Sequence, residues 1–383
     1  MVNDTVVSSF SASSPPPSQL VARSPRSLSL DFVPVQNYEA MKARYNVVYQ
    51  QDMLQVGKCD YDGVETWIDA VRPLMKQPPW GQIEVAGACL QEIKEVGRLA
   101  QVDATRLERA MRNSIYIPSL ISRIDRRITE HREREDAKLS STTTSRSFHW
   151  TTSEYGDVPL IFCRTNECSM KHSTSYKVRP FRNGADIMDQ LLRDRRLISW
   201  LSMDKCNITS TTLYLSDFDT SFQSKNEYRV FIWKGRVTGI SQYRWFETPE
   251  TEYHTEQDAL RICADIVEFI EGADGLINHL RAERRNKKNK VLMRMRTENS
   301  AAEATETNEA VNVAEHVGHD DKDDHEIVLV ADVVHTHGTV YLVEINLFGG
   351  ETGCGSSLFH WKRDEHILYS DGQQVVCRFL SRA

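Results

Sequence analysis

Three side chains with metal-binding oxygens lie close together near the C-terminal end of the chain. Asp332 lies on one predicted apolar strand, and Glu344 and Asn346 lie on the next. Two carboxylates and an amide on otherwise apolar strands are costly to desolvate unless a positive charge lies between them. Mg²⁺ prefers oxygen ligands, takes few of them from the protein, and completes its shell with water and phosphate groups. The pattern therefore predicts a magnesium site that serves a nucleotide.

The expected geometry of these two strands follows from the loop that joins them. A three-residue loop, Thr336 to Gly338, places Asp332 opposite Leu342. Alternation puts Glu344 and Asn346 on the same face as Leu342. The Asp332 side chain is expected on this same face, as a diagonal neighbour of Glu344. The two Cβ atoms would then be roughly 7 to 8 Å apart, a distance that one or two hard cations can bridge. The alternative is an edge strand whose polar side chains face solvent while Asp332 caps the loop.

A second pair of strands is predicted from 227 to 243, with a turn at Lys234 and Gly235. Glu227 and Arg229 share one face of the first strand, and apolar residues form the other. An arginine beside a glutamate in mid-strand predicts an ion pair that holds Arg229 where its fork of donors reaches a phosphate. A cross-strand ion pair on a solvated face is the alternative.

Two further stretches bear on a bound anion. Lys177 and Arg179 occupy alternate positions of a predicted strand, so both can face an anion, although solvent exposure explains the same pattern. The glycines of LFGGETGCGSSLFHW, after Asn346, allow a close backbone approach but match neither a P-loop nor a dinucleotide-binding fingerprint. Neither a G-x-S-x-G nor an H-E-x-x-H motif occurs in the sequence, so these hydrolase signatures are excluded.

Composition argues against several classes of protein. The net charge of −7 disfavours a dedicated nucleic-acid binder. Eight scattered cysteines without a C-x-x-C pair are typical of a reducing compartment rather than of a disulfide framework or zinc site. No apolar run approaches the roughly 18 residues of a membrane span, and the N-terminus lacks the apolar core of a signal peptide. We therefore expect a cytoplasmic protein. A transit peptide, suggested by the Ser-rich start, is the minority alternative.

The order of patterns predicts an α+β protein in three parts. Residues 1–30 are Ser- and Pro-rich and are expected to form a disordered tail. Residues 31–146 show helical periodicity and end in the linker-like LSSTTTSRS. Residues 147–383 contain the predicted strands, with an expected disordered insertion at 282–326, where a basic block adjoins an acidic one. Contact of 281–296 with nucleic acid is the alternative for the basic block.

Two segments together resemble the cell division cycle protein 123 family. EYRVFIWKGRVTGISQY resembles that family's segment of Glu, aromatic residue and Arg, followed by a strand, a turn and I-S-Q. VEINLFGG followed by SSLFHW resembles its acidic-x-Asn segment, which closes in L-F-x-W. The resemblance covers about residues 148 to 369. It implies an ATP-grasp fold, with a two-lobed core of antiparallel sheets and helices, preceded here by the helical region.

The resemblance also implies a function and a set of contacts. The family is known as an ATP-binding assembly factor for eukaryotic translation initiation factor 2 that engages its gamma subunit. Adenine would contact the backbone near Leu213 to Leu215. The remaining contacts with Mg²⁺ and the phosphates of ATP fall on six residues: Asp332, Glu344 and Asn346 for the metal, and Arg229 with Lys177 or Arg179 for the phosphates.

Three functions are compatible with these observations. The first is an assembly factor that binds ATP and Mg²⁺ without catalysing a reaction. The second is an ATP-dependent carboxylate–amine ligase, in which Arg229 steadies the transferred phosphoryl group. The third is a degenerate grasp that binds only protein. It is favoured by Ser216 and Asp217, which follow the expected hinge strand where the family has basic residues.

Overall fold

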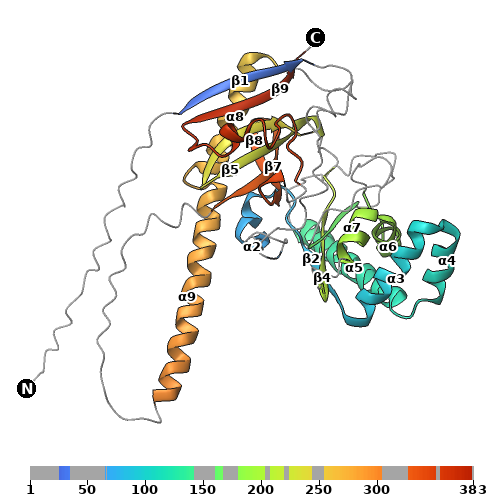
Figure 1. Ribbon diagram of the computed structural model, residues 1–383. Coiled ribbons are helices and arrows are strands. Elements are labelled where there is room, and N and C mark those ends of the chain that lie inside the picture. Colours follow the sequence, from blue (N-terminus) through green and yellow to red (C-terminus); the bar gives the residue numbers. More distant parts are fainter. Residues whose placement is uncertain are drawn as a thin grey trace, which may run out of the picture.

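Two sheets and the helices that cover them build an α+β protein, as the sequence predicts (Figure 1). The six-stranded sheet has the order β1-β9-β6-β5-β7-β8 and, with α2, α8, α9 and α10, forms the large lobe. The three-stranded sheet has the order β2-β4-β3 and, with α3 to α7, forms the small lobe. The computed structural model describes residues 26–34, 65, 67–141, 160–166, 180–202, 208–219, 224–243, 254–303, 327–350 and 354–381.

The large sheet is mixed rather than antiparallel, because β9 runs parallel to both β1 and β6. The remaining pairs are antiparallel, and two of them, β5 with β6 and β7 with β8, are hairpins. The strands are β1 (Ser27–Pro34), β5 (Glu227–Trp233), β6 (Arg236–Gln242), β7 (Leu329–Thr336), β8 (Thr339–Asn346) and β9 (Gln374–Ser381). The start of β1 at Ser27 shows that the expected disordered tail, 1–30, extends too far, because its last residues pair with β9.

The large sheet has one apolar face under helices and another under the C-terminal loop. Tyr228, Val230 and Ile232 face α8 (Glu256–Glu271), whereas Phe231 points the other way into an aromatic cluster. This alternation along β5 is the predicted one. The aromatic cluster is closed by the residues that follow β8 and by α10 (Glu365–Leu368): Phe348, Phe359, Trp361 and Leu368.

The small lobe combines helices and strands in a single core, so the helical region 31–146 is not a separate domain. Its strands are β2 (Gly81–Ala86), β3 (Ile161–Thr165) and β4 (Ser210–Asp217). Its helices are α3 (Gly87–Val102), α4 (Ala104–Asn113), α5 (Ile117–Ser141), α6 (Gly184–Arg193) and α7 (Arg195–Leu201). The apolar stripes of α3 and α5 must be buried, and they are buried against these strands and α6.

A long helix replaces part of the expected disordered insertion. α9 spans Leu276–Glu303, so the first part of the stretch 282–326 is helical, and residues 304–326 lie outside the described residues. The N-terminal turns of α9 pack against α2 (Ile68–Val71) and α8 in the core of the large lobe. Short 3-10 helices at Arg72–Leu74 and Ser224–Asn226 complete the described elements. No helix among the described residues has the length and apolar character needed to cross a membrane.

The carboxylate of Glu92, on α3, caps the N-terminus of α5. It accepts hydrogen bonds from the Ser114 hydroxyl and from the backbone N–H groups of Ile115, Tyr116 and Ile117, at 2.5 to 3.1 Å. Partial burial raises the pKa of Glu92, but these four hydrogen bonds lower it by more, so that the net pKa lies below its ordinary value.

We expect Glu92→Gln to lower the free energy of unfolding by about 1 kcal/mol at neutral pH, after allowing for solvent screening. Because the folded-state pKa is depressed, this contribution is complete above the unfolded pKa of about 4.3 and is lost as the pH falls through the folded value. Urea unfolding at several pH values measures it, with the exposed Glu95→Gln on the same helix as control. A deficit that stays constant down to pH 3 would contradict the assignment.

Candidate functional site

The turn between β7 and β8 has two residues rather than the expected three. His337 and Gly338 both have positive φ, 51° and 75°, and Thr336 pairs with Thr339. This conformation matches the tight hairpin turns whose twist suits the flanking strands. The pairing then shifts by one residue at a β-bulge beside Val333.

This bulge decides which residues face the site. Asp332 lies directly opposite Glu344, not opposite Leu342 as predicted. Leu342 points into the α8-covered core, whereas Glu344 and Asn346 lie on the other face with Asp332. The predicted sharing of a face with Leu342 is therefore wrong. The carboxylates are nevertheless closer in register than predicted, and the Asn346 amide donates to Asp332 Oδ2 at 3.0 Å.

Arg229 on β5 is paired with Asp332, directly across on β7. Two parallel hydrogen bonds of 2.8 Å join the guanidinium to the two carboxylate oxygens, and both side chains are almost fully buried. The expected partner, Glu227, lies two positions away on the same strand, at a backbone spacing of about 7 Å, whereas a residue directly across a strand pair is closer. Register therefore selects Asp332.

Two further contacts hold the guanidinium of Arg229 in place. Arg229 donates to the backbone carbonyl of Gly355 and lies 4.3 Å from the centre of the Tyr243 ring. Burial by itself lowers the pKa of Arg229. The attraction of Asp332, with smaller contributions from Cys354 and Tyr243, outweighs this effect, so that the net pKa lies well above its ordinary value. The site therefore holds a fixed positive charge at every physiological pH.

A second arginine reaches the site from the small lobe. Arg164 on β3 donates to Glu344 at 2.9 Å, and its guanidinium lies 5.6 Å from the centre of the Trp67 ring. Arg164 is only 4% exposed. Its Nε is buried and has no hydrogen-bond partner among the described residues. A buried donor without a partner is costly, and a ligand oxygen at the junction of the lobes would satisfy it.

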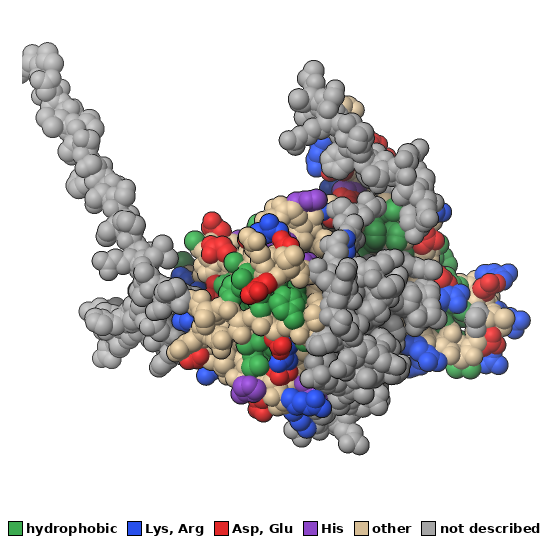
Figure 2. All heavy atoms as spheres, turned by 90° about the horizontal axis from the view of Figure 1, so that it is seen from above, with side chains coloured by type: hydrophobic (Ala, Val, Ile, Leu, Met, Phe, Trp, Pro, Cys, Tyr) green, Lys and Arg blue, Asp and Glu red, His purple; other side chains and the backbone are tan. Residues whose placement is uncertain are grey.

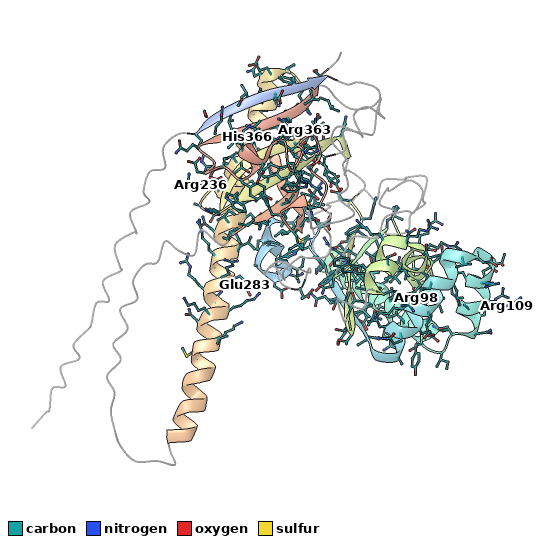
Figure 3. The ribbon with its side chains drawn as sticks, viewed as in Figure 1. Arg98, Arg109, Arg236, Glu283, Arg363 and His366 are labelled. Atoms are coloured by element: carbon teal, nitrogen blue, oxygen red, sulfur yellow. The ribbon has the colours of Figure 1, made fainter. Side chains whose placement is uncertain are left out.

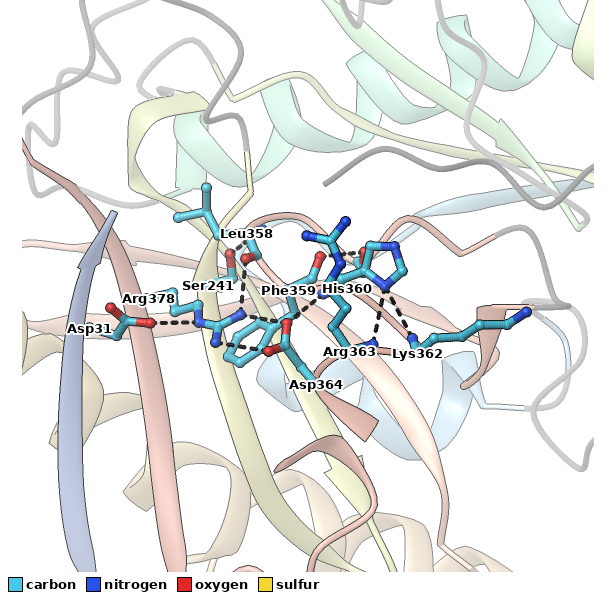
Figure 4. A network of polar contacts seen from close by, with 10 residues as sticks. Asp31, Ser241, Leu358, Phe359, His360, Lys362, Arg363, Asp364 and Arg378 are labelled. Atoms are coloured by element: carbon cyan, nitrogen blue, oxygen red, sulfur yellow. Dashed lines mark hydrogen bonds and ion pairs between the residues drawn. The ribbon is translucent and has the colours of Figure 1, made fainter. Parts of the chain in front are cut away.

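Arg378 holds the loop after β8 in place (Figure 4). Arg378 on β9 donates to both oxygens of Asp364, to Asp31 on β1 and to the carbonyl of Leu358. Its guanidinium also lies 4.4 Å from the centre of the Phe359 ring. This network holds the stretch that presents the Gly355 carbonyl to Arg229, so β1 and β9 support the site through this loop.

The remaining predicted contacts comprise Lys177, Arg179, Leu213, Leu215 and Glu227. Lys177 and Arg179 lie outside the described residues. Leu213 and Leu215 have their side chains in the core of the small lobe, and β4 is paired on both sides along this stretch. The backbone from 213 to 215 therefore presents no open strand edge to an adenine ring. Glu227 is buried at the start of β5, where its carbonyl accepts from the Tyr243 N–H.

The donor set fits a hard cation that is shared with phosphate. Asp332, Glu344 and Asn346 are oxygen ligands of the kind that Mg²⁺ uses. Among the described residues no three His, Cys, Asp or Glu side chains gather into a metal site, so the third protein ligand would be the amide. In this structure each carboxylate is neutralised by an arginine. Binding of a metal would require Arg229 or Arg164 to exchange a carboxylate for another anion.

Arg164 is the functional candidate that sequence reasoning missed. Its signal was an arginine at the end of the apolar run LIFC, where a charged residue on a buried strand needs a partner. The partner, Glu344, is 180 positions further along the chain, and nothing local in the sequence indicates the pairing.

Comparison with known proteins yields a structural likeness only. No protein-family model matches the chain, and no curated protein matches it in sequence. The solved structures of Cdc123 and of C-terminally truncated Cdc123, both from Schizosaccharomyces pombe, each match with a TM-score of 0.46 and 12% identity over 85% of this chain. The matches cover 99% and 100% of those chains, respectively. The chain is thus similar to these two structures at low sequence identity.

Proposed function

We propose that this protein binds ATP and Mg²⁺ between its two lobes, over β7 and β8. The observation that carries the proposal is the meeting of Arg164, from the small lobe, with Asp332, Glu344 and Arg229 of the large lobe. Two fixed cations beside two carboxylates and an amide suit a polyanion that arrives with a metal ion. Bound Mg²⁺ would neutralise part of the phosphate charge.

The chain's own residues supply orientation and charge. Arg229, held by Asp332, Gly355 and Tyr243, offers a pre-positioned fork of donors. The Nε–H of Arg164 has no hydrogen-bond partner among the described residues and can donate to a ligand, while the ion pair with Glu344 links the small lobe to the site. A phosphate that accepts from both arginines would release the carboxylates for the metal. Nucleotide binding would therefore exchange one set of ion pairs for another and keep the two lobes together.

We further propose that the bound nucleotide has a structural role in an assembly factor. The support is the motif resemblance carried by β5, β6, β8 and the loop after β8; β5 and β6 pair with one another, and β7 joins them to β8 in the same sheet. The target would be translation initiation factor 2, engaged through its gamma subunit. Affinity capture from eukaryotic cytosol tests this: recovery of that subunit supports the role, whereas recovery of other partners without it contradicts the role.

Calorimetry with Mg-ATP tests nucleotide binding. We expect saturable binding that requires the metal and is weakened about three- to tenfold by Asn346→Ala, which removes a neutral ligand and leaves both ion pairs in place. Asn113→Ala, on the surface of α4, is the matched control. If titration of the folded protein with Mg-ATP released or absorbed no heat of binding, the proposal would be overturned in favour of a degenerate ATP-grasp protein that binds only protein. Phosphate release with candidate acids and amines would favour the ligase.

A further inference from the structure

The distal part of α9 projects from the large lobe as an unsupported basic rod (Figure 1). Leu276, Ile277 and Leu280 are buried and anchor its N-terminal turns. Beyond them, every described side chain from Arg285 to Met293 is exposed. At about 1.5 Å per residue, the 28-residue helix is about 42 Å long, and the exposed stretch from Arg285 to Met293 covers about 13 Å of it.

The charged residues of this rod are almost all positive. Residues 281–296 contain eight arginines and lysines and a single acid, Glu283, in a chain whose net charge is −7. The only acid is engaged within the helix, with Lys287 Nζ 3.8 Å from Glu283 Oε1. On the body of the protein, by contrast, Lys and Arg lie among Asp and Glu on the face seen in Figure 2. The excess of positive charge over residues 281–296 therefore belongs to α9 itself.

The arrangement of these charges indicates the kind of partner. With 3.6 residues per turn, the exposed Arg285, Lys287, Lys288 and Lys290 are spread around the helix rather than along one side. A helix that lies in a membrane surface needs an apolar face opposite a basic one. The exposed apolar residues whose side chains are described, Val291 and Met293, are two positions apart and so lie about 200° from one another. The rod lacks a membrane-binding face in this described part.

We propose that the exposed part of α9, residues 285–293, binds the phosphate backbone of nucleic acid. A polyanion that surrounds or runs along the rod can contact cations on several sides, and such contacts are independent of base sequence. This surface lies on a different element from the candidate nucleotide site, so the proposal stands independently of ATP binding. Contact of 281–296 with nucleic acid, an alternative left open by the sequence, thereby gains a structural basis.

The test uses the full chain, so that the acidic residues that follow α9 in the sequence are included in the measurement. A labelled 20-nucleotide single-stranded RNA, the matching RNA duplex and the matching DNA duplex are titrated in fluorescence anisotropy at several salt concentrations. The variant Arg285→Gln/Lys287→Gln/Lys288→Gln/Lys290→Gln is expected to bind about tenfold more weakly near 0.1 M salt. Its plot of log K against log salt should be shallower by about 2 to 3 on single strands.

A matched control removes the same number of exposed charges elsewhere. Arg98→Gln/Arg106→Gln/Arg109→Gln/Arg112→Gln acts on the small lobe, where Figure 3 shows Arg98 and Arg109 far from Glu283 on α9. It should keep the wild-type affinity and salt slope. Circular dichroism confirms that both variants are folded. The proposal is overturned if the wild type binds none of the three probes at low salt or if both variants lose affinity equally.

Discussion

Asp332→Ala should lower the free energy of unfolding by about 3 to 5 kcal/mol, the largest loss that we expect from a single substitution at the candidate site. Asp332 and Arg229 are 1% and 5% exposed and are joined by two hydrogen bonds of 2.8 Å. Truncation of the carboxylate leaves the guanidinium buried without its counter-charge, and that uncompensated charge accounts for most of the cost. Urea unfolding monitored by circular dichroism measures the effect.

Two companion variants separate the buried pair from a general loss of charge. Asp274→Ala removes an exposed carboxylate from the same lobe and should stay within about 0.5 kcal/mol of the wild type. Arg229→Met/Asp332→Leu replaces both partners and should recover most of the loss, because an apolar pair of similar volume needs no solvation. The same double variant should not bind Mg-ATP. If Asp332→Ala were as stable as Asp274→Ala, the pair would not be buried in solution.

Arg164→Met should weaken Mg-ATP binding by about 10- to 100-fold, the value of one or two hydrogen bonds between a charged donor and phosphate. Arg164 is the cation that the small lobe contributes at the junction, and its Nε is a donor without a partner among the described residues. Arg164→Lys keeps the charge but loses the fork, so it should lie between the wild type and Arg164→Met. Calorimetry with Mg-ATP gives the affinities.

The control for this prediction is Arg195→Met, an exposed arginine on the small lobe outside the junction, which should bind Mg-ATP as the wild type does. Since Arg164→Met also leaves Glu344 without its ion-pair partner, the urea midpoint of each variant is measured beside the affinity. Folded Arg164→Met with wild-type affinity would show that the arginine only joins the lobes. Equal losses for Arg164→Lys and Arg164→Met would show that the geometry of the fork, not the charge, decides.

Some of the fold was evident in the sequence because it depends on neighbours along the chain. The alternation of β5 and the turn at Lys234 and Gly235 are local patterns, and both are present in the structure. The hairpin that carries Asp332 and Glu344 was predicted for the same reason. Polar residues on apolar strands marked the candidate site before any pairing was known, since such residues need partners wherever they are buried.

Only the tertiary structure decided which partners these residues have. The two-residue turn and the bulge beside Val333 place Glu344 opposite Asp332, because helix α8 buries one face of the sheet and a register slip would expose it. Arg164 meets Glu344 across the junction of the lobes, and β1 pairs with β9 from the opposite end of the chain. Contacts between distant segments depend on how whole elements pack, so no local pattern records them.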